Sequence, residues 1–225
     1  VDPRNILITA GASAGLLLAI ALTTESGDDV IMADPCYPCN RELVEAFGGR
    51  VVLAPTNAAS RYQLDVRTMT QVWTSSTNAI VLATPSNPTG TTIPFDELVR
   101  ICREARARGA WRIVDEIYLS LADPDAGGRP ARTALETDRE VMIVSSFSKY
   151  FGMTGWRLGW LVLPDELLAA ADNLAVNFFL CASTPTQMAA LSCFTPEALA
   201  ACGRGLDAMD VSRSRRRPGT SSPAW

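Results

Sequence analysis

Short apolar runs alternate with segments of helical periodicity along the first 180 residues of the chain. The runs have the length of buried β-strands, and glycine, proline or aspartate stands at most of the junctions. A seven-stranded arrangement is therefore predicted. The strands are expected at residues 6–9, 30–33, 51–55, 79–83, 111–114, 141–144 and 158–162.

Helices are predicted in the intervals. The clearest begins at Pro94, carries an apolar face that includes Leu98 and Ile101, and stops at Gly109. Proline at the start and glycine just past the end are the expected boundary signals of a helix. The other helices are expected from residue 16 onward, at 41–47, at 65–73, at 165–179, and after 184–185.

Strands that alternate with helices, several of them uniformly apolar, predict an α/β fold. Its mainly parallel seven-stranded sheet should be covered by helices on both faces. Ligands bind such sheets beyond the carboxyl ends of the strands. Polar clusters follow five of the strands and should converge on one rim of the sheet; they occupy residues 11–13, 34–37, 86–90, 115–118 and 145–149.

Composition restricts the classes of function. The chain has 225 residues, of which 48% are hydrophobic and 20% charged, as expected for a globular protein. A formal net charge of -4 argues against a general nucleic-acid binder. The longest apolar runs fall short of the roughly 20 residues of a membrane span, and residues 1–4 do not have the pattern of a signal peptide.

Six cysteines are present, and several lie in apolar runs, which suits buried thiols better than a disulfide framework. Cys36-Tyr-Pro-Cys39 has the spacing of redox and zinc motifs. Zinc needs four ligands, however, and the chain has no histidine and no second closely spaced cysteine pair. We therefore expect no metal site, and redox use of this pair is disfavoured.

Lys149 is the only lysine among 20 basic residues. Arginine stays protonated, whereas a lysine can lose its proton and attack a carbonyl carbon. Ser146, Ser148 and Arg157 lie nearby in sequence and suit an anion such as phosphate. An amine nucleophile beside a phosphate site suggests pyridoxal phosphate. On the count alone, a genome bias toward arginine would explain the lone lysine equally well.

Two other motifs suggest different enzymes. Gly11-Ala-Ser-Ala-Gly15 matches the nucleophile elbow of serine hydrolases, but that serine needs a histidine base, which this chain lacks. Ser146-Phe-Ser-Lys149 matches the S-x-x-K motif of penicillin-binding acylases. The companion motifs of that family are absent and its fold differs, so it remains a distant alternative.

The order of motifs resembles the large domain of class I/II pyridoxal phosphate-dependent aminotransferases, which have fold type I and belong to the aspartate aminotransferase superfamily. One such motif is weak evidence, but five in order over residues 9–157 are highly specific. They are Thr9-Ala-Gly-Ala-Ser13, Asp34-Pro-Cys-Tyr-Pro38, Ser86-Asn-Pro-Thr-Gly90, Asp115-Glu-Ile-Tyr118, and Ser146-Phe-Ser-Lys149 with Gly155-Trp-Arg157.

The resemblance implies roles for individual residues. Lys149 would be the Schiff-base lysine that moves the substrate proton, and Asp115 would pair with the pyridine nitrogen. Asn87 and Tyr118 would hydrogen-bond the phenolic oxygen of the cofactor, and Tyr37 would stack on its ring. Outside this context, Asp115 would be a helix cap and Asn87 a turn residue.

The phosphate is expected where the first helix begins. The resemblance places it against the amides of Gly11, Ala12 and Ser13, because a helix N-terminus favours anions. The hydroxyls of Ser13 and Ser146 and the guanidinium of Arg157 would complete this site, although a serine alone is more often a cap. Ala12 stands where relatives often have glycine, and Asn40 lies near the position of a histidine that supports the aspartate in some relatives.

The resemblance also implies a domain plan. We expect a cofactor-binding large domain over residues 1–180, a helical start of the connection to a small domain over 181–210, and an aberrant, disordered tail over 211–225. Relatives have an N-terminal segment and a C-terminal small domain that are not visible here, so we expect a fragment with weak or absent turnover. In full-length form we expect a cytoplasmic homodimer.

The predicted activity is exchange of an amino group between an L-amino acid and a 2-oxo acid with pyridoxal 5′-phosphate as cofactor. Lyases and synthases share this fold and constellation, so they remain alternatives. A further alternative is a non-catalytic module that binds the cofactor, as in the aminotransferase-like domains of some bacterial regulators.

Overall fold

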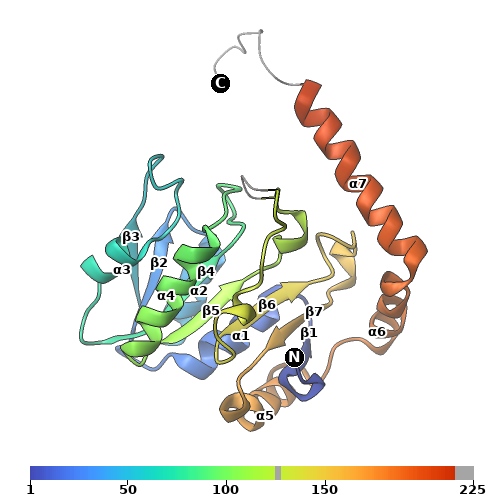
Figure 1. Ribbon diagram of the computed structural model, residues 1–225. Coiled ribbons are helices and arrows are strands. Elements are labelled where there is room, and N and C mark those ends of the chain that lie inside the picture. Colours follow the sequence, from blue (N-terminus) through green and yellow to red (C-terminus); the bar gives the residue numbers. More distant parts are fainter. Residues whose placement is uncertain (125–127, 216–225) are drawn as a thin grey trace, which may run out of the picture.

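The computed structural model describes residues 1–124 and 128–215, with side chains described as far as residue 205. It contains one seven-stranded sheet with helices on both faces, as predicted (Figure 1). The strand order across the sheet is β1-β7-β6-β5-β4-β2-β3. The strands are β1 (Ile6–Thr9), β2 (Asp29–Asp34), β3 (Arg50–Pro55), β4 (Thr77–Ala83), β5 (Trp111–Asp115), β6 (Met142–Ser146) and β7 (Gly159–Val162).

One strand reverses direction. β2 to β6 form a parallel set, whereas β7 pairs antiparallel with both β6 and β1. Thr9 at the end of β1 and Ser146 at the end of β6 both lie opposite Gly159, the first residue of β7. The chain therefore enters β7 at the rim where the parallel strands end, and the segment before β7 joins that rim.

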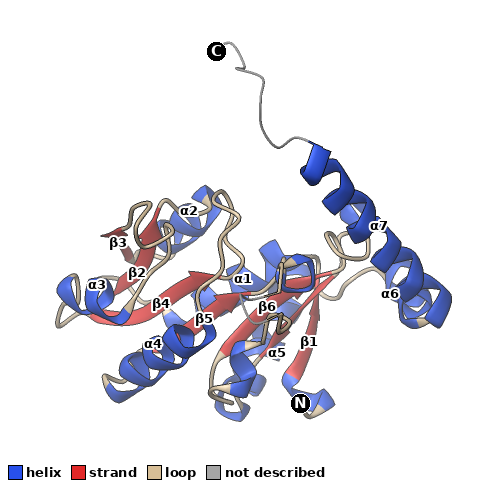
Figure 2. Cartoon of the chain, turned by 45° about the horizontal axis from the view of Figure 1, so that its top comes forward, coloured by secondary structure: helices blue, strands red, loops and turns tan. Residues whose placement is uncertain are grey.

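The helices form two layers, which Figure 2 shows in a second view. The first layer contains α1, α2 and α5, and the second contains α3 and α4, with separate apolar cores against the two faces of the sheet. Their bounds are α1 (Ala12–Thr23), α2 (Pro38–Ala46), α3 (Val66–Gln71), α4 (Phe95–Ala107) and α5 (Leu168–Phe179).

The centre of the sheet is apolar because both of its faces are covered. In β4, Ala79 and Val81 belong to the core under α1, while Ile80 and Leu82 belong to the core under α4. All four side chains are at most 3% exposed. Successive residues of a strand point to opposite faces, so burial on both sides requires an unbroken apolar run.

The chain beyond the sheet is helical. α6 (Thr184–Ala190) and the 3₁₀ turn Leu191–Phe194 precede α7 (Pro196–Arg215), which extends away from the sheet in Figures 1 and 2. The segment predicted as a disordered tail begins inside α7, and residues 216–225 lie outside the described part of the chain. No helix within the described residues is both long and apolar enough to cross a membrane.

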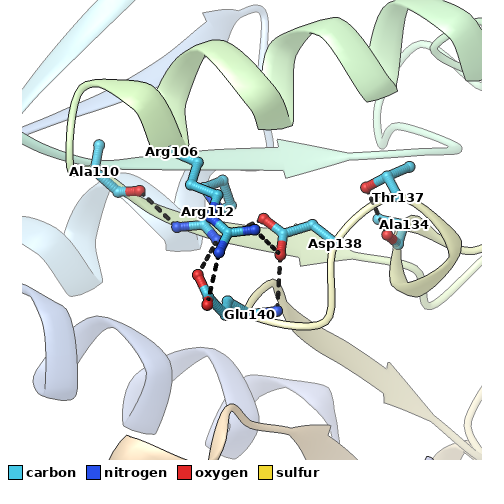
Figure 3. Close-up of polar contacts among 7 residues, drawn as sticks. All are labelled: Arg106, Ala110, Arg112, Ala134, Thr137, Asp138 and Glu140. Atoms are coloured by element: carbon cyan, nitrogen blue, oxygen red, sulfur yellow. Dashed lines mark hydrogen bonds and ion pairs between the residues drawn. The ribbon is translucent and has the colours of Figure 1, made fainter.

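A buried ion pair joins the start of β5 to the segment before β6 (Figure 3). The guanidinium of Arg112 lies 2.6 Å from a carboxylate oxygen of Asp138, and both side chains are about 5–6% exposed. Arg112 also donates to the carbonyl of Ala110, and Glu140 stands 3.6 Å away. This network therefore links the start of β5 to the segment that leads into β6.

Candidate active site

A cavity of about 230 Å³ lies at the predicted rim. Its walls come from segments that are far apart in sequence: the start of α1, the β2–α2 and β4–α4 connections, the ends of β5 and β6, and the approach to β7. Eight of the ten residues predicted to bind a cofactor line it. These are Ala12, Ser13, Tyr37, Asn87, Asp115, Tyr118, Lys149 and Arg157, while Gly11 and Ser146 do not.

One end of the cavity has the features that suit an anion. Gly11 caps α1 without a side chain, so the first amides of this 12-residue helix have no side-chain partner. Gly11 has φ +85°, and a Cβ there would lie 2.5 Å from Nη2 of Arg157. Arg157 itself has φ +53° and donates to the carbonyl of Thr154 over 3.1 Å. Glycine thus lets the guanidinium approach the helix start closely.

The two serines before Lys149 have different positions. Ser146 is buried, with its hydroxyl 3.0 Å from the carbonyl of Leu158 and 2.9 Å from the hydroxyl of Ser148. Its oxygen also accepts from the amide of Ser148 over 2.9 Å. Ser148, not Ser146, lines the cavity. The sequence predicted that Ser146 contacts the phosphate, but in this structure Ser148 lies at the cavity and Ser146 does not.

Asp115 supplies a buried carboxyl at the end of β5. It is 8% exposed and accepts one hydrogen bond, from the amide of Ile117 over 3.0 Å. Burial raises the pKa of this carboxyl to about 6. None of the described lysines and arginines forms an ion pair with it. The position therefore suits a cationic group of a ligand, which would stabilise the charged carboxylate.

Lys149 and two tyrosines face the same space. The Nζ atom of Lys149 lies 5.5 Å from the ring centroid of Tyr118, within the range of a cation–π contact. Tyr37 lines the wall at the start of α2, and the pKa of its phenol is raised, first by its hydrogen bond with the Cys39 thiol. An amine, a carboxyl and two phenols thus share one cavity.

Two further residues matter to the site. Thr154, which no sequence pattern marked, lines the cavity and donates its hydroxyl to the carbonyl of Ser148 over 2.8 Å. Asn40 does not line this cavity; it lines a second cavity of about 20 Å³, which Tyr37 also borders. Asn40 is 2% exposed, and its Oδ1 has no hydrogen-bond partner among the described residues.

A doubly covered α/β sheet with a lysine, a buried aspartate and an open helix N-terminus at one rim defines the large domain of a fold-type I pyridoxal phosphate enzyme. The chain belongs to the aminotransferase class I and II family, because the family model matches residues 1–215. Members of this family generally use pyridoxal phosphate.

Individual aminotransferases match the chain over nearly all of its length. The chain is 40% identical over 214 residues to a valine–pyruvate aminotransferase of Mycobacterium tuberculosis, covering 95% of this chain and 54% of that protein. It is 32% identical over 220 residues to a (5-formylfuran-3-yl)methyl phosphate transaminase of Methanocaldococcus jannaschii, covering 96% and 54%. A crystal structure of an aminotransferase from Mycobacterium tuberculosis superposes with a TM-score of 0.90 at 40% identity, covering 95% and 55%. The chain thus spans about half the length of these relatives.

Proposed function

We propose that this chain binds pyridoxal 5′-phosphate in the 230 Å³ cavity and serves amino-group exchange between an L-amino acid and a 2-oxo acid. One observation carries the proposal. Lys149 and Asp115 line the same cavity as the start of α1 and Arg157. A reactive amine, a partner for a ring nitrogen and an anion site are the three contacts that this cofactor requires.

The phosphate would occupy the anion end. The amides of Ala12 and Ser13 at the start of α1 would donate to it, and the positive end of the helix dipole would favour its charge. The hydroxyls of Ser13 and Ser148 and the guanidinium of Arg157 would complete the set. The space that Gly11 leaves open beside Arg157 fits this assignment.

The pyridine ring would lie between Tyr37 and Asp115. When bound, the cofactor supplies an aldehyde for amines and a ring that stabilises negative charge at the reacting carbon. Asp115 would hold a proton on the ring nitrogen, and that cation would lower the raised pKa of Asp115. Asn87 and Tyr118 would hydrogen-bond the phenolic oxygen, and Tyr37 would cover one face of the ring.

Lys149 would perform the proton chemistry. Its Nζ would hold the cofactor through the aldehyde carbon, and as a free amine it would move the proton of the substrate α-carbon. The contact with the Tyr118 ring, 5.5 Å from Nζ, would keep the amine over the reacting atoms.

The absorbance spectrum of the purified protein with pyridoxal phosphate tests the proposal. We expect a visible band that is lost in Lys149→Ala. Lys149→Arg is the matched control, because it keeps the positive charge but removes the nucleophile. A band of equal intensity in Lys149→Ala would reject the assignment of this lysine.

Substrate exchange needs a separate test. The relative from Mycobacterium tuberculosis is named for valine and pyruvate, so these two compounds and 2-oxoglutarate are the first to assay. Among the described residues, Arg157 is the one arginine that lines the cavity, and we assign it to the phosphate. A substrate carboxylate then lacks its own arginine, so we expect weak turnover by these 225 residues. Release of ammonia rather than transfer of the amino group would favour lyase chemistry.

We further propose that the full-length form is a homodimer. Large apolar side chains are exposed in the segment after the sheet, which supports a surface that a second subunit covers. Leu180, just after α5, is 75% exposed, and Met188 in α6 is 63% exposed. Sedimentation of the full-length protein tests this, and a monomer at micromolar concentration would contradict it.

A further inference from the structure

The β2–α2 connection and the first turn of α2 carry two thiols that the proposed function does not use. Cys36 and Cys39 flank Tyr37 and Pro38, where Tyr37 is the N-cap of α2 and Pro38 its first residue. Two cysteines with this spacing at the first turn of a helix in a β–α–β unit are typical of reversible disulfides. Redox use of this pair was disfavoured together with zinc binding, but the missing ligands bear only on zinc, because a disulfide needs none. Within the described residues, no group of three metal-ligating side chains occurs.

The two thiols differ in accessibility. Both are free; Cys39 is exposed and Cys36 is half-buried. Burial, together with the nearby charge of Asp34, raises the pKa of the Cys36 thiol. An oxidant would therefore meet Cys39 first, and Cys36 would resolve the product.

Tyr37 connects these thiols to the large cavity. Tyr37 lines the large cavity, and the neighbouring Cys39 thiol raises the pKa of its phenol. Tyr37 also lines the 20 Å³ cavity, together with Cys36 and Asn40. The side-chain oxygen of buried Asn40 has no partner among the described residues. Tyr37 thus borders both cavities, and the smaller one leaves space into which its side chain can shift.

We propose that Cys36 and Cys39 form a reversible disulfide that displaces the Tyr37 ring and weakens binding in the large cavity. Formation of the disulfide does not depend on the proposed function, whereas its effect on cofactor binding rests on that function. The thiolate of Cys39 attacks one sulfur of a low-molecular-weight disulfide such as oxidised glutathione and releases one glutathione thiol. The thiolate of Cys36 then attacks the Cys39 sulfur and releases the second. The protein loses two electrons and two protons, which the two glutathione thiols carry away.

Mass spectrometry tests the disulfide. The reduced protein is incubated in glutathione buffers of defined potential, free thiols are alkylated, and the peptides are mapped. We expect a bond between Cys36 and Cys39 that dithiothreitol reverses and that Cys36→Ser abolishes. Cys181→Ser is the matched control, because Cys181 is also exposed but has no cysteine three residues away. Finding only glutathione adducts on Cys39 would overturn the proposal.

The displacement of Tyr37 is measured without the cofactor. The chain has four tyrosines, so labelled tyrosine rings give few NMR signals, and Tyr37→Phe identifies that of residue 37. We expect this signal to shift on oxidation of the wild type and to stay constant in Cys36→Ser. An unchanged signal in the fully oxidised wild type would refute the displacement.

The effect on binding is measured by titration with pyridoxal phosphate. We expect the oxidised protein to bind about threefold to tenfold more weakly, as the loss of one aromatic stacking contact predicts. The Cys36→Ser protein should bind equally in both buffers. Equal affinity of the oxidised and reduced wild type would disprove this effect. If the reduced wild type binds no pyridoxal phosphate, the proposed function fails, while the mass and NMR results still decide on the disulfide.

Discussion

The guanidinium of Arg157 lies directly against the Cα side of Gly11, where a Cβ would stand 2.5 Å from Nη2. The two residues come from opposite ends of the motif series and meet because β7 runs antiparallel between β1 and β6. Their contact joins the start of α1 to the approach to β7. It forms the end of the cavity that we assign to the phosphate, which neither segment provides alone.

We expect Gly11→Ala to weaken binding of pyridoxal phosphate by roughly tenfold or more, because the methyl group displaces Arg157 and φ +85° is strained for alanine. Titration followed by absorbance measures this. Gly27→Ala is the matched control, since Gly27 has φ +96° with no atom within 4 Å of its would-be Cβ. If both variants bind alike, the contact with Arg157 does not contribute to affinity.

Gly159→Ala is expected to destabilise the fold. A Cβ at Gly159 would lie 2.7 Å from the carbonyl oxygen of Ser145 and from the carbonyl carbon of Gly11, and backbone atoms cannot move aside. The expected loss is about 2–4 kcal/mol in the free energy of unfolding. Urea denaturation measures it. Gly155→Ala, whose Cβ would meet nothing within 4 Å, should cost far less.

The acid Glu116 predicts a pH effect on stability. It is 5% exposed, accepts hydrogen bonds from Thr133 and from the amide of Ala134, and burial raises its pKa from 4.5 to about 7. The folded state then binds the proton more tightly than the unfolded state. The contribution of protonated Glu116 to the free energy of unfolding is complete below about pH 4.5 and is lost as pH rises toward 7.

We therefore expect Glu116→Gln to gain about 2–3 kcal/mol relative to the wild type between pH 4.5 and pH 7.5. The amide keeps an acceptor for Ala134 and carries no charge to bury. Urea denaturation at both pH values measures the difference, with exposed Glu42→Gln as the control. A difference that does not change with pH would contradict the raised pKa.

Asp115 should behave similarly, but with sensitivity to the cofactor. Its pKa is raised from 3.8 to about 6, so in the apoprotein its stabilising contribution is lost as pH rises through this window. Bound pyridoxal phosphate would bring a cation to the carboxylate and reverse the penalty. We expect Asp115→Asn to stabilise the apoprotein at pH 7.5 and to weaken cofactor binding. A variant that binds the cofactor as tightly as the wild type would exclude the proposed pairing.

Because the ion pair of Arg112 and Asp138 is buried, we expect a large loss of stability when the charge of Asp138 is removed. Asp138→Asn leaves the buried guanidinium without its charged partner at 2.6 Å, and we expect a loss of about 3 kcal/mol or more. Thermal unfolding checks this. Arg100→Ala is the control, because Arg100 is 64% exposed in its pair with Glu97 and should cost less than about 1 kcal/mol. Equal losses would mean that burial does not decide the value of these pairs.

Local sequence determined the strands, the helices and the identity of most cavity residues. The run from Ala79 to Ala83 predicts a doubly buried strand, and Asp65 predicts the cap of α3, where its carboxylate accepts from the amide of Thr68 over 2.6 Å. The polar clusters were expected on one rim because parallel strands end on the same side. These features depend on neighbouring residues in the chain, so pattern and motif suffice to predict them.

Tertiary structure decided how those elements meet. No local pattern states that β7 reverses, yet this pairing carries Arg157 to Gly11. Tertiary packing also decides that Ser148 lines the cavity while Ser146 donates to the carbonyl of Leu158, and that Asn40 lines the smaller cavity. The physical reason is that strand direction and side-chain orientation follow from packing and hydrogen bonds between distant segments, which the order of residues along the chain does not specify.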